Sequence, residues 1–102
     1  MEPVLRRLTD DEIAGALAQL EGWMVVDGKL SREYVFADFV EAIGFMMRAA
    51  IAAEKMNHHP EWSNTYRRVH VLLITHDVAG ISPLDVQLAR TMDELAAPAA
   101  PA

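Results

Sequence analysis

The residues whose types could do chemistry gather in one short stretch, where two adjacent histidines precede a proline. His58 and His59 carry imidazoles, which titrate near neutral pH and serve as acid, base or metal ligand. Pro60 disfavours α geometry at His59, so a helix that enters this stretch should end about there. The two rings therefore need not point apart. We expect them to converge on one cavity, which His76, after the next β-rich run, could complete.

Carboxylates stand at spacings that suit these imidazoles. Glu54 and His58 are one helical turn apart, so Glu54 is predicted to orient the His58 ring. Each residue also has a simpler interpretation. His58 would be favoured at a helix C-terminus by the dipole, Asp85 at a helix start, and Trp62 would suit the core. His70 lies in the middle of a predicted strand, and we assign it a structural or surface role.

A metal site is the competing interpretation of the same side chains. Three imidazoles and a carboxylate, from His58, His59, His76 and Glu54, are legitimate zinc ligands. However, neighbouring histidines seldom both bind one ion, and the sequence has no HExxH-type spacing. We therefore expect no metal here.

Composition limits what these residues can belong to. The chain has 102 residues, 52% hydrophobic and 24% charged, which fits one compact domain. Nine basic against 15 acidic residues give a net charge of −6, so direct nucleic-acid binding is not expected. There is no cysteine, which suits a reducing compartment, and we expect the cytoplasm. Neither a signal peptide nor an apolar run of about 18 residues is visible, so no membrane association is expected.

Helix and turn signals divide the first half of the chain. Thr9 and Glu12 form a capping box, which predicts a helix that ends near Gly22. Residues 23–26 and 29–37 are typical of two strands, and the Asp27-Gly28 pair between them favours a tight hairpin turn.

The longest helix is predicted from residue 39 to about residue 57. Its main apolar stripe recurs every three or four residues, at Phe39, Ile43, Met46, Met47, Ala50 and Ile51. Val40, Phe45 and Ala49 fall outside this stripe. The helix is either simply well buried, or it packs on a sheet with one face and on a partner subunit with another.

The second half adds a strand and a helix. Residues 63–75 form a β-rich run that predicts one central strand, and Ser82-Pro83 marks the start of a last helix. The order helix, strand, strand, helix, strand, helix indicates an α+β domain with an antiparallel-biased small sheet. We place that domain at residues 1–95 and expect the Ala/Pro-rich residues 96–102 to be a disordered tail.

A family resemblance rests on residue types that recur at fixed separations over more than thirty positions: Glu54, His58, His59, Pro60, Tyr66, His76 and Asp85. This pattern resembles the signature of the pterin-4a-carbinolamine dehydratases, and the resemblance covers roughly residues 5–95. It implies an α+β fold in which about three helices pack on one face of a four-stranded sheet. It also implies a homodimer or homotetramer that dehydrates 4a-hydroxytetrahydropterins to quinonoid dihydropterins, with pterin as substrate and no metal or other cofactor.

The resemblance also implies roles for particular residues. His58, His59 and His76 would be the catalytic imidazoles. A second set of residues would bind the pterin or shape and support its pocket: Glu54, Asn57, Pro60, Trp62, Thr75 and Asp85. Loss of water from C4a needs one proton delivered to the hydroxyl and one removed from N5, which paired histidines can supply. One of His58 and His59 would act at N5 and another imidazole, with His76 a candidate, at the hydroxyl.

Two further points follow from the resemblance. Asn57 departs from the aspartate that many family members have at this position, and an amide supplies no negative charge. The substrate would come from an aromatic amino-acid hydroxylase, to which the protein would be functionally coupled. The alternative function is non-enzymatic: a dimerisation or assembly factor of the same fold, for which the widely apolar long helix is suited.

Overall fold

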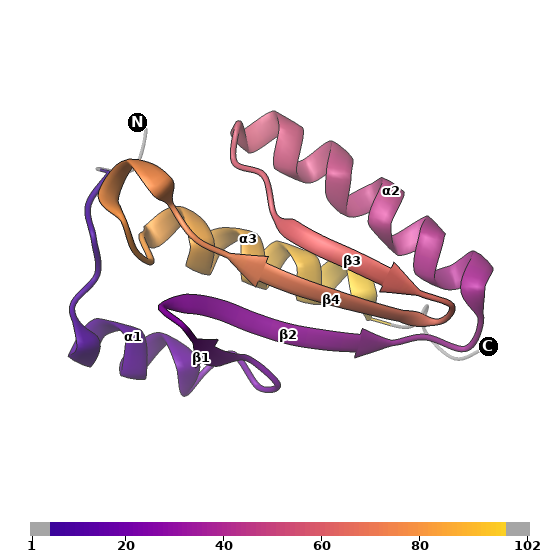
Figure 1. Cartoon of the computed structure of the whole chain (residues 1–102), viewed down its shortest axis with the longest axis horizontal. Helices are drawn as coiled ribbons and strands as arrows, with labels where there is room; N and C mark the ends of the chain where they lie inside the picture. Colours follow the sequence, from indigo (N-terminus) through magenta and orange to yellow (C-terminus); the bar gives the residue numbers. More distant parts are fainter. Residues whose placement is uncertain (1–4, 98–102) are drawn as a thin grey trace.

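The computed structural model describes residues 5–97, which form a four-stranded sheet, three α-helices and one short 3-10 helix. Along the chain the elements are α1 (Asp10–Leu17), β1 (Met24–Val26), β2 (Lys29–Val35), α2 (Phe39–Met56), β3 (Glu61–Thr65), β4 (Arg68–Leu73), η1 (His76–Val78) and α3 (Pro83–Ala96). The strands lie in the order β1-β2-β4-β3, and each neighbouring pair is antiparallel. The predicted α+β fold is confirmed (Figure 1).

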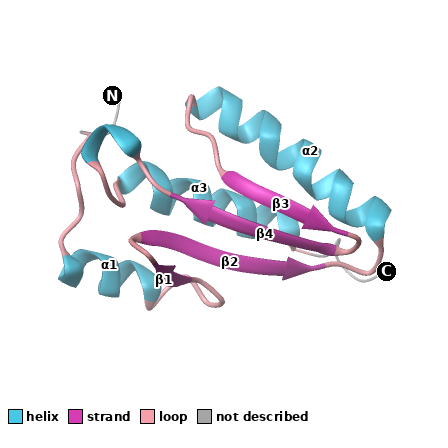
Figure 2. Ribbon diagram, in the orientation of Figure 1, coloured by secondary structure: helices cyan, strands magenta, loops and turns pink. Residues whose placement is uncertain are grey.

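The sheet has one covered and one open face. Helices α2 and α3 lie against the covered face (Figure 2), where alternate residues of β2 and β4 are buried. On the open face, polar cross-strand pairs join the strands, among them Lys29 with Glu61 at 2.7 Å and Ser31 with His70 at 3.1 Å. His70 is exposed there and pairs with Ser31, which fits the structural or surface role predicted for it.

The predicted first hairpin is present. Asp27 and Gly28 connect β1 to β2 with φ angles of 51° and 76°. Positive φ at both central residues matches the twist of a two-residue hairpin, and Asp-Gly tolerates it. The capping boxes at Thr9 and Ser82 and the cap at Asp38 are also formed.

The prediction of one central strand over residues 63–75 is wrong, because this run folds into the hairpin of β3 and β4. Tyr66 turns the chain with φ of 51°, in the left-handed region. The Asn64 side chain donates to the carbonyl oxygens of Tyr66 and Arg68, at 2.9 Å each, and so closes the turn. The turn contains neither glycine nor proline, the residues that usually mark a turn in a sequence.

Helix α2 does not turn its main apolar stripe toward the sheet. The buried residues of α2 are Ala42, Phe45, Ala49 and Ala53. Three alanines let the helix lie close to the sheet, and Phe45 fills the core beside Tyr34 with ring centroids 4.8 Å apart. The large side chains of the expected stripe are therefore mostly left outside, at Phe39, Ile43, Met47 and Ile51.

A polar cluster at Asp93 ties α3 to the sheet. Its carboxylate accepts hydrogen bonds from Trp23 Nε1 at 3.0 Å, Arg32 Nη1 at 2.9 Å and the Tyr34 hydroxyl at 2.5 Å. Burial raises the pKa of Tyr34, and the hydrogen bond to Asp93 raises it further. Tyr34 therefore remains a neutral donor, which holds α3 in the position that the site requires.

Two observations concern the limits of the domain. Ala96 ends α3, so the first residue of the expected tail is helical, while residues 98–102 lie outside the described part. No helix within residues 5–97 combines the length and apolar composition that a bilayer crossing requires.

Candidate active site

The end of α2 determines where the two adjacent histidines point. Asn57 has left-handed geometry (φ 52°, ψ 41°), and its amide donates to the Glu54 carbonyl. The His58 amide then donates to the Ala53 carbonyl at 3.0 Å. These two bonds form a Schellman motif, for which asparagine is the usual substitute for glycine. The helix thus ends at Met56, before the point that Pro60 would impose, and the reversal turns His58 inward.

His58 is held by a buried carboxylate. Its Nε2 lies 2.5 Å from Asp85 Oδ1, and the two side chains are 10% and 0% exposed. The partner is therefore Asp85, whereas Glu54 was predicted from helical spacing. Because Nε2 is engaged, Nδ1 is the ring nitrogen left for other contacts.

The Asp85 carboxylate also accepts hydrogen bonds from two further groups. The Thr75 hydroxyl donates to Oδ2 at 2.7 Å, and the Ser82 amide donates to the same oxygen at 2.9 Å. The hydroxyls of Thr75 and Ser82 lie 2.6 Å apart. Asp85 is thus both the capping-box residue of α3 and the support of His58, since it reaches the neighbouring cavity only through that imidazole.

His59 pairs with Glu54, the carboxylate that was predicted to pair with His58. Its Nε2 lies 2.7 Å from Glu54 Oε1, and the side chains of His59 and Glu54 are 59% and 77% exposed. The left-handed residue at position 57 moves the chain off the helical path, so the four-residue spacing of Glu54 and His58 no longer brings them together. Glu54 orients the exposed imidazole.

His76 begins η1 and is exposed. Its side chain makes no hydrogen bond within residues 5–97. Glu61, at the start of β3, is a carboxylate whose pKa is affected by His76. The hydrogen bond from Lys29 lowers the pKa of Glu61, and the nearby His76 lowers it further.

The three imidazoles converge on one cavity of about 260 Å³, which we call the histidine cavity. Its walls are Leu5, Asn57, His58, His59, Ile74, Thr75, His76, Asp77 and Leu84. Five of the nine residues predicted for the site therefore line it. The lining is mixed, with imidazole, amide, hydroxyl and carboxylate groups beside aliphatic ones, so several polar groups can fix the orientation of a bound ligand.

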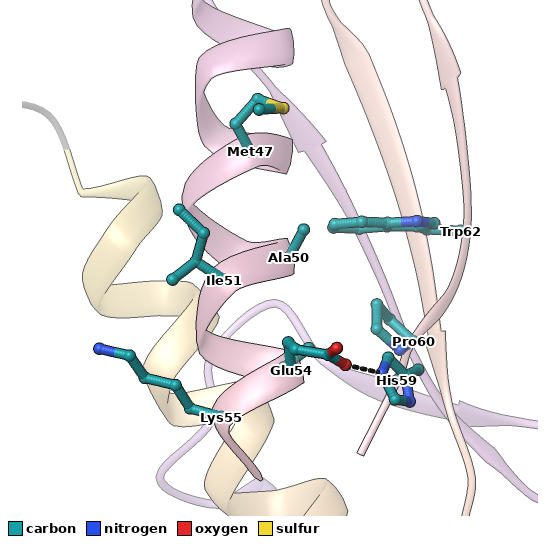
Figure 3. A pocket seen from close by; sticks show the side chains of 9 residues that line it. Met47, Ala50, Ile51, Glu54, Lys55, His59, Pro60 and Trp62 are labelled. Carbon is teal, nitrogen blue, oxygen red and sulfur yellow. Dashed lines mark hydrogen bonds and ion pairs between the residues drawn. The ribbon is translucent and has the colours of Figure 1, made fainter. Parts of the chain in front are cut away.

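A second and larger cavity lies between the C-terminal half of α2 and the start of β3. This apolar cavity has a volume of about 560 Å³ and is lined by Met47, Ala50, Ile51, Ala53, Glu54, Lys55, His59, Pro60 and Trp62. Figure 3 shows Trp62 extending from the strand toward Ala50, with Pro60 beside its ring. Glu54, Pro60 and Trp62, which were predicted to shape a single pterin pocket, belong to this cavity.

Sequence reasoning missed several of these residues. Ser82 was interpreted only as a helix cap, although its amide and hydroxyl hold the Thr75–Asp85 pair. Met47 and Ile51 were assigned only to the main apolar stripe of the helix, and they line an open cavity. The αL geometry of Asn57 was the one feature with a usable signal, since asparagine after a helix commonly adopts it. Within residues 5–97, no group of three or more metal-binding side chains is arranged around a common point.

Comparison with known proteins gives a consistent result. The family model described as Pterin 4 alpha carbinolamine dehydratase matches residues 6–95. A relative from Solibacter usitatus (strain Ellin6076) is 55% identical over 89% of this chain and 96% of its own length. One from Bradyrhizobium sp. (strain ORS 278) is 51% identical over 92% of this chain and 96% of its own. The names of both relatives contain the words pterin-4-alpha-carbinolamine dehydratase.

A solved structure shows the same likeness in three dimensions. It is a crystal structure from Brucella melitensis described as a transcriptional coactivator/pterin dehydratase. It superposes with a TM-score of 0.86 at 48% identity and covers 89% of this chain and 99% of that one. Sequence and fold agree over nearly the whole described chain, and the protein belongs to the pterin-4-alpha-carbinolamine dehydratase family.

Proposed function

We propose that this protein is a hydro-lyase that removes water from a 4a-hydroxytetrahydropterin and gives the quinonoid dihydropterin. The observation that carries the proposal is the convergence of His58, His59 and His76 on one cavity, with two of the rings held by carboxylates. Family membership supplies the substrate class. The structure supplies the groups that would move the protons.

The reaction needs two proton transfers and no oxidant. His59 takes the proton from N5, and the nitrogen electrons form the double bond to C4a. His76 delivers a proton to the hydroxyl on C4a, which leaves as water. Imidazoles suit both steps because they exchange protons near neutral pH. Glu54, hydrogen-bonded to His59, stabilises the imidazolium that this ring becomes, as a carboxylate behind a histidine does in other acid–base sites.

The remaining residues bind the substrate and hold the rings in place. His58 donates or accepts a hydrogen bond through Nδ1, and Asp85 acts through His58 as a positioning residue. Asn57 and Thr75 provide polar contacts at the wall of the histidine cavity, and Trp62 and Pro60 border it across His59. In this proposal pterin is the substrate rather than a cofactor, and imidazoles carry out both proton transfers.

The test is a dehydration assay in which 4a-hydroxytetrahydropterin is generated by an aromatic amino-acid hydroxylase. That enzyme is also the proposed cytoplasmic partner in pterin recycling. The protein should accelerate decay of the intermediate, and His58→Ala or His76→Ala should each slow it by about 10²-fold or more. His70→Ala is the matched control, since that histidine lies on the open sheet face. Decay at the buffer rate with the wild-type protein would refute the proposal.

A second candidate function is association with a second copy of the chain as a dimerisation or assembly factor. Val40 is 77% exposed and Met47 62% exposed, and Val40, Ile43 and Met47 recur along α2 at the spacing of a helix–helix seam. The Brucella melitensis structure, described as a transcriptional coactivator as well as a dehydratase, also favours a non-enzymatic role. We propose that this seam makes a homodimer or homotetramer.

Light scattering tests the association. Ile43→Glu combined with Val40→Glu should reduce the measured mass to that of one chain, because charges replace the apolar seam. Val35→Glu, an exposed apolar position on β2, is the control and should leave the mass unchanged. Dehydration that persists in the monomeric variant would separate assembly from catalysis, whereas a wild-type protein that is already monomeric would contradict the proposed association.

A further inference from the structure

We propose that Leu5 is a substrate-binding residue of the histidine cavity, where its side chain packs on one face of the pterin ring and excludes water from that face. The inference rests on the proposed function and adds to it a wall that comes from the chain before α1. Residues 5–8, which we call the docking segment, hold Leu5 in place by binding to the loop after β4.

Leu5 is one of three aliphatic side chains in the wall of the histidine cavity, together with Ile74 and Leu84. The other walls carry polar or ionisable groups. Ile74 and Leu84 are half-buried, whereas Leu5 is 42% exposed. Leu5 therefore has the most apolar surface left to bury against a ligand. A ring with polar edges and apolar faces suits such a cavity, because polar groups fix its edges while an aliphatic side chain covers a face.

The docking segment is fastened to the loop after β4 at two points (Figure 1). The Leu8 amide donates a hydrogen bond to the Ile81 carbonyl at 2.8 Å. The Arg7 side chain lies directly over Gly80, where an added Cβ would come within 2.8 Å of Arg7 Nε and 3.1 Å of its Cδ and Cγ. The absence of a side chain at Gly80 is therefore what lets Arg7 lie so close to the loop. These contacts bring Leu5 to the cavity.

Side chains alternate in direction along the docking segment. Arg6 donates to both carboxylate oxygens of Glu12 in α1, at 2.8 and 2.6 Å. Leu5 and Arg7 both contact the side that faces the loop after β4, as expected for alternate residues of an extended chain. Arg6 is thus directed away from the cavity, and the hydrocarbon side chain of Leu5 is the one that the segment presents to it.

The kinetic effect of Leu5 follows from the kind of contact that it makes. An aliphatic group on the face of the ring neither donates nor accepts a proton. Its contact is the same in the ground state and in the transition state, so it should lower KM and leave kcat unchanged. A role in folding alone would instead change the urea midpoint and leave the KM of the folded protein as it is.

The experiment measures dehydration kinetics and urea unfolding of Leu5 variants with one 4a-hydroxytetrahydropterin as substrate. Leu5→Ala and Leu5→Asn should each raise KM about four- to fifteenfold, the effect expected when one or two methylene groups no longer leave water. Both should keep kcat within about twofold and the urea midpoint unchanged. Leu5→Met retains the apolar bulk and should keep the wild-type KM. Val26→Ala is the control, because Val26 is similarly exposed, at 40%, and lies on β1.

A second variant acts through the docking segment and leaves the cavity wall unchanged. Gly80 does not line the histidine cavity, but Gly80→Ala should displace Arg7 and with it the segment. KM should rise, and the increase should disappear when Leu5 is already alanine, since both changes remove the same contact. Gly15→Ala is the matched control, because a Cβ at Gly15 meets no atom within 4 Å.

Several results would overturn the inference and leave the dehydratase function intact. These are a wild-type KM in Leu5→Ala and Leu5→Asn, a loss confined to kcat, a wild-type KM in Gly80→Ala, or effects of Leu5→Ala and Gly80→Ala that add in full. A wild-type protein that does not dehydrate the substrate would overturn the proposed function, and this inference with it.

Discussion

Two neighbouring histidines in this protein meet two carboxylates in opposite surroundings. His58 and Asp85 form a pair that is almost completely buried, and its partners are 27 residues apart in the sequence. His59 and Glu54 form a pair of similar length that is mostly exposed, and its partners are 5 residues apart. The side-chain types are nearly the same, so the difference lies in burial and in the other bonds of each carboxylate.

This difference distinguishes a pair that holds the fold together from a pair that is accessible to a ligand. Asp85 also accepts hydrogen bonds from Thr75 and from the Ser82 amide, so the buried pair belongs to the packing between α3 and the loop after β4. Within residues 5–97 the exposed pair has no such neighbours, which leaves its imidazole accessible to a ligand. Removal of one partner of a buried pair strongly destabilises the fold, whereas an exposed pair contributes little to stability.

The largest effect should follow removal of the buried carboxylate. Asp85→Ala leaves Thr75, the Ser82 amide and His58 without their acceptor, and should lower the free energy of unfolding by about 3 to 5 kcal/mol. Activity should be lost even where the variant stays folded, since His58 is no longer oriented. Urea unfolding followed by circular dichroism measures the first effect. Asp77→Ala, an exposed aspartate at the same cavity, is the control, and an equal loss in both variants would contradict the special role of the buried pair.

Removal of the exposed imidazole should affect catalysis and spare the fold. His59→Gln should reduce kcat by about 10²- to 10⁴-fold, because it removes the group that we propose to take the proton from N5. Its free energy of unfolding should change by less than about 0.5 kcal/mol, as for other surface substitutions. Kinetics and urea unfolding on the same preparation provide both values. Destabilisation as large as that of Asp85→Ala would remove the distinction between the two pairs.

A smaller effect is expected from the carboxylate of the exposed pair. Glu54→Gln keeps a hydrogen-bond acceptor for His59 and removes the charge that stabilises the imidazolium. Activity should fall about three- to tenfold, in line with one weakened charge-assisted hydrogen bond. High salt should diminish the difference from wild type, because the pair is exposed. A loss of 10³-fold would mean that Glu54 takes part in the proton transfer itself.

The smallest effect concerns an exposed pair far from the histidines. The Arg6 guanidinium, hydrogen-bonded to Glu12, lowers the pKa of Glu12 to about 2. Because this pKa is depressed in the folded state, the stabilisation is present above about pH 4.5 and is lost as the pH falls toward about 2. Titration of Glu12 by NMR checks the shift. Glu12→Gln should abolish this pH dependence and leave dehydration unchanged.

Features that depend on neighbours in the sequence were predictable. The caps at Thr9, Asp38 and Ser82 and the turn at Asp27-Gly28 require particular residue types at fixed short spacings, and all are present. The turn at Tyr66 was not predictable. It depends on an asparagine amide that bridges two carbonyls, a signal that strand-forming residues on both sides conceal.

Features that depend on packing were only partly predictable. Periodicity identified α2 and its length, but it did not show which of its apolar faces packs on the sheet. The face that packs on the sheet consists of Phe45 and three alanines, because small side chains allow the helix to approach the sheet closely. The candidate site residues were predicted from their types, their joint spacing and the family resemblance. Their division between two cavities was not predicted, since it follows from a left-handed Asn57 that separates the directions of His58 and His59.

The double use of Asp85 has a consequence for the order in which the site is assembled. Domains form from the N-terminus as the chain is synthesised. A nascent chain that has reached Gly80 already contains all three imidazoles, and its exposed pair needs nothing beyond the end of α2. The inward histidine nevertheless has no anchor until the last helix is made and docks. The appearance of dehydratase activity on the ribosome would therefore report completion of the fold, and a chain truncated before α3 would carry every imidazole without a working site.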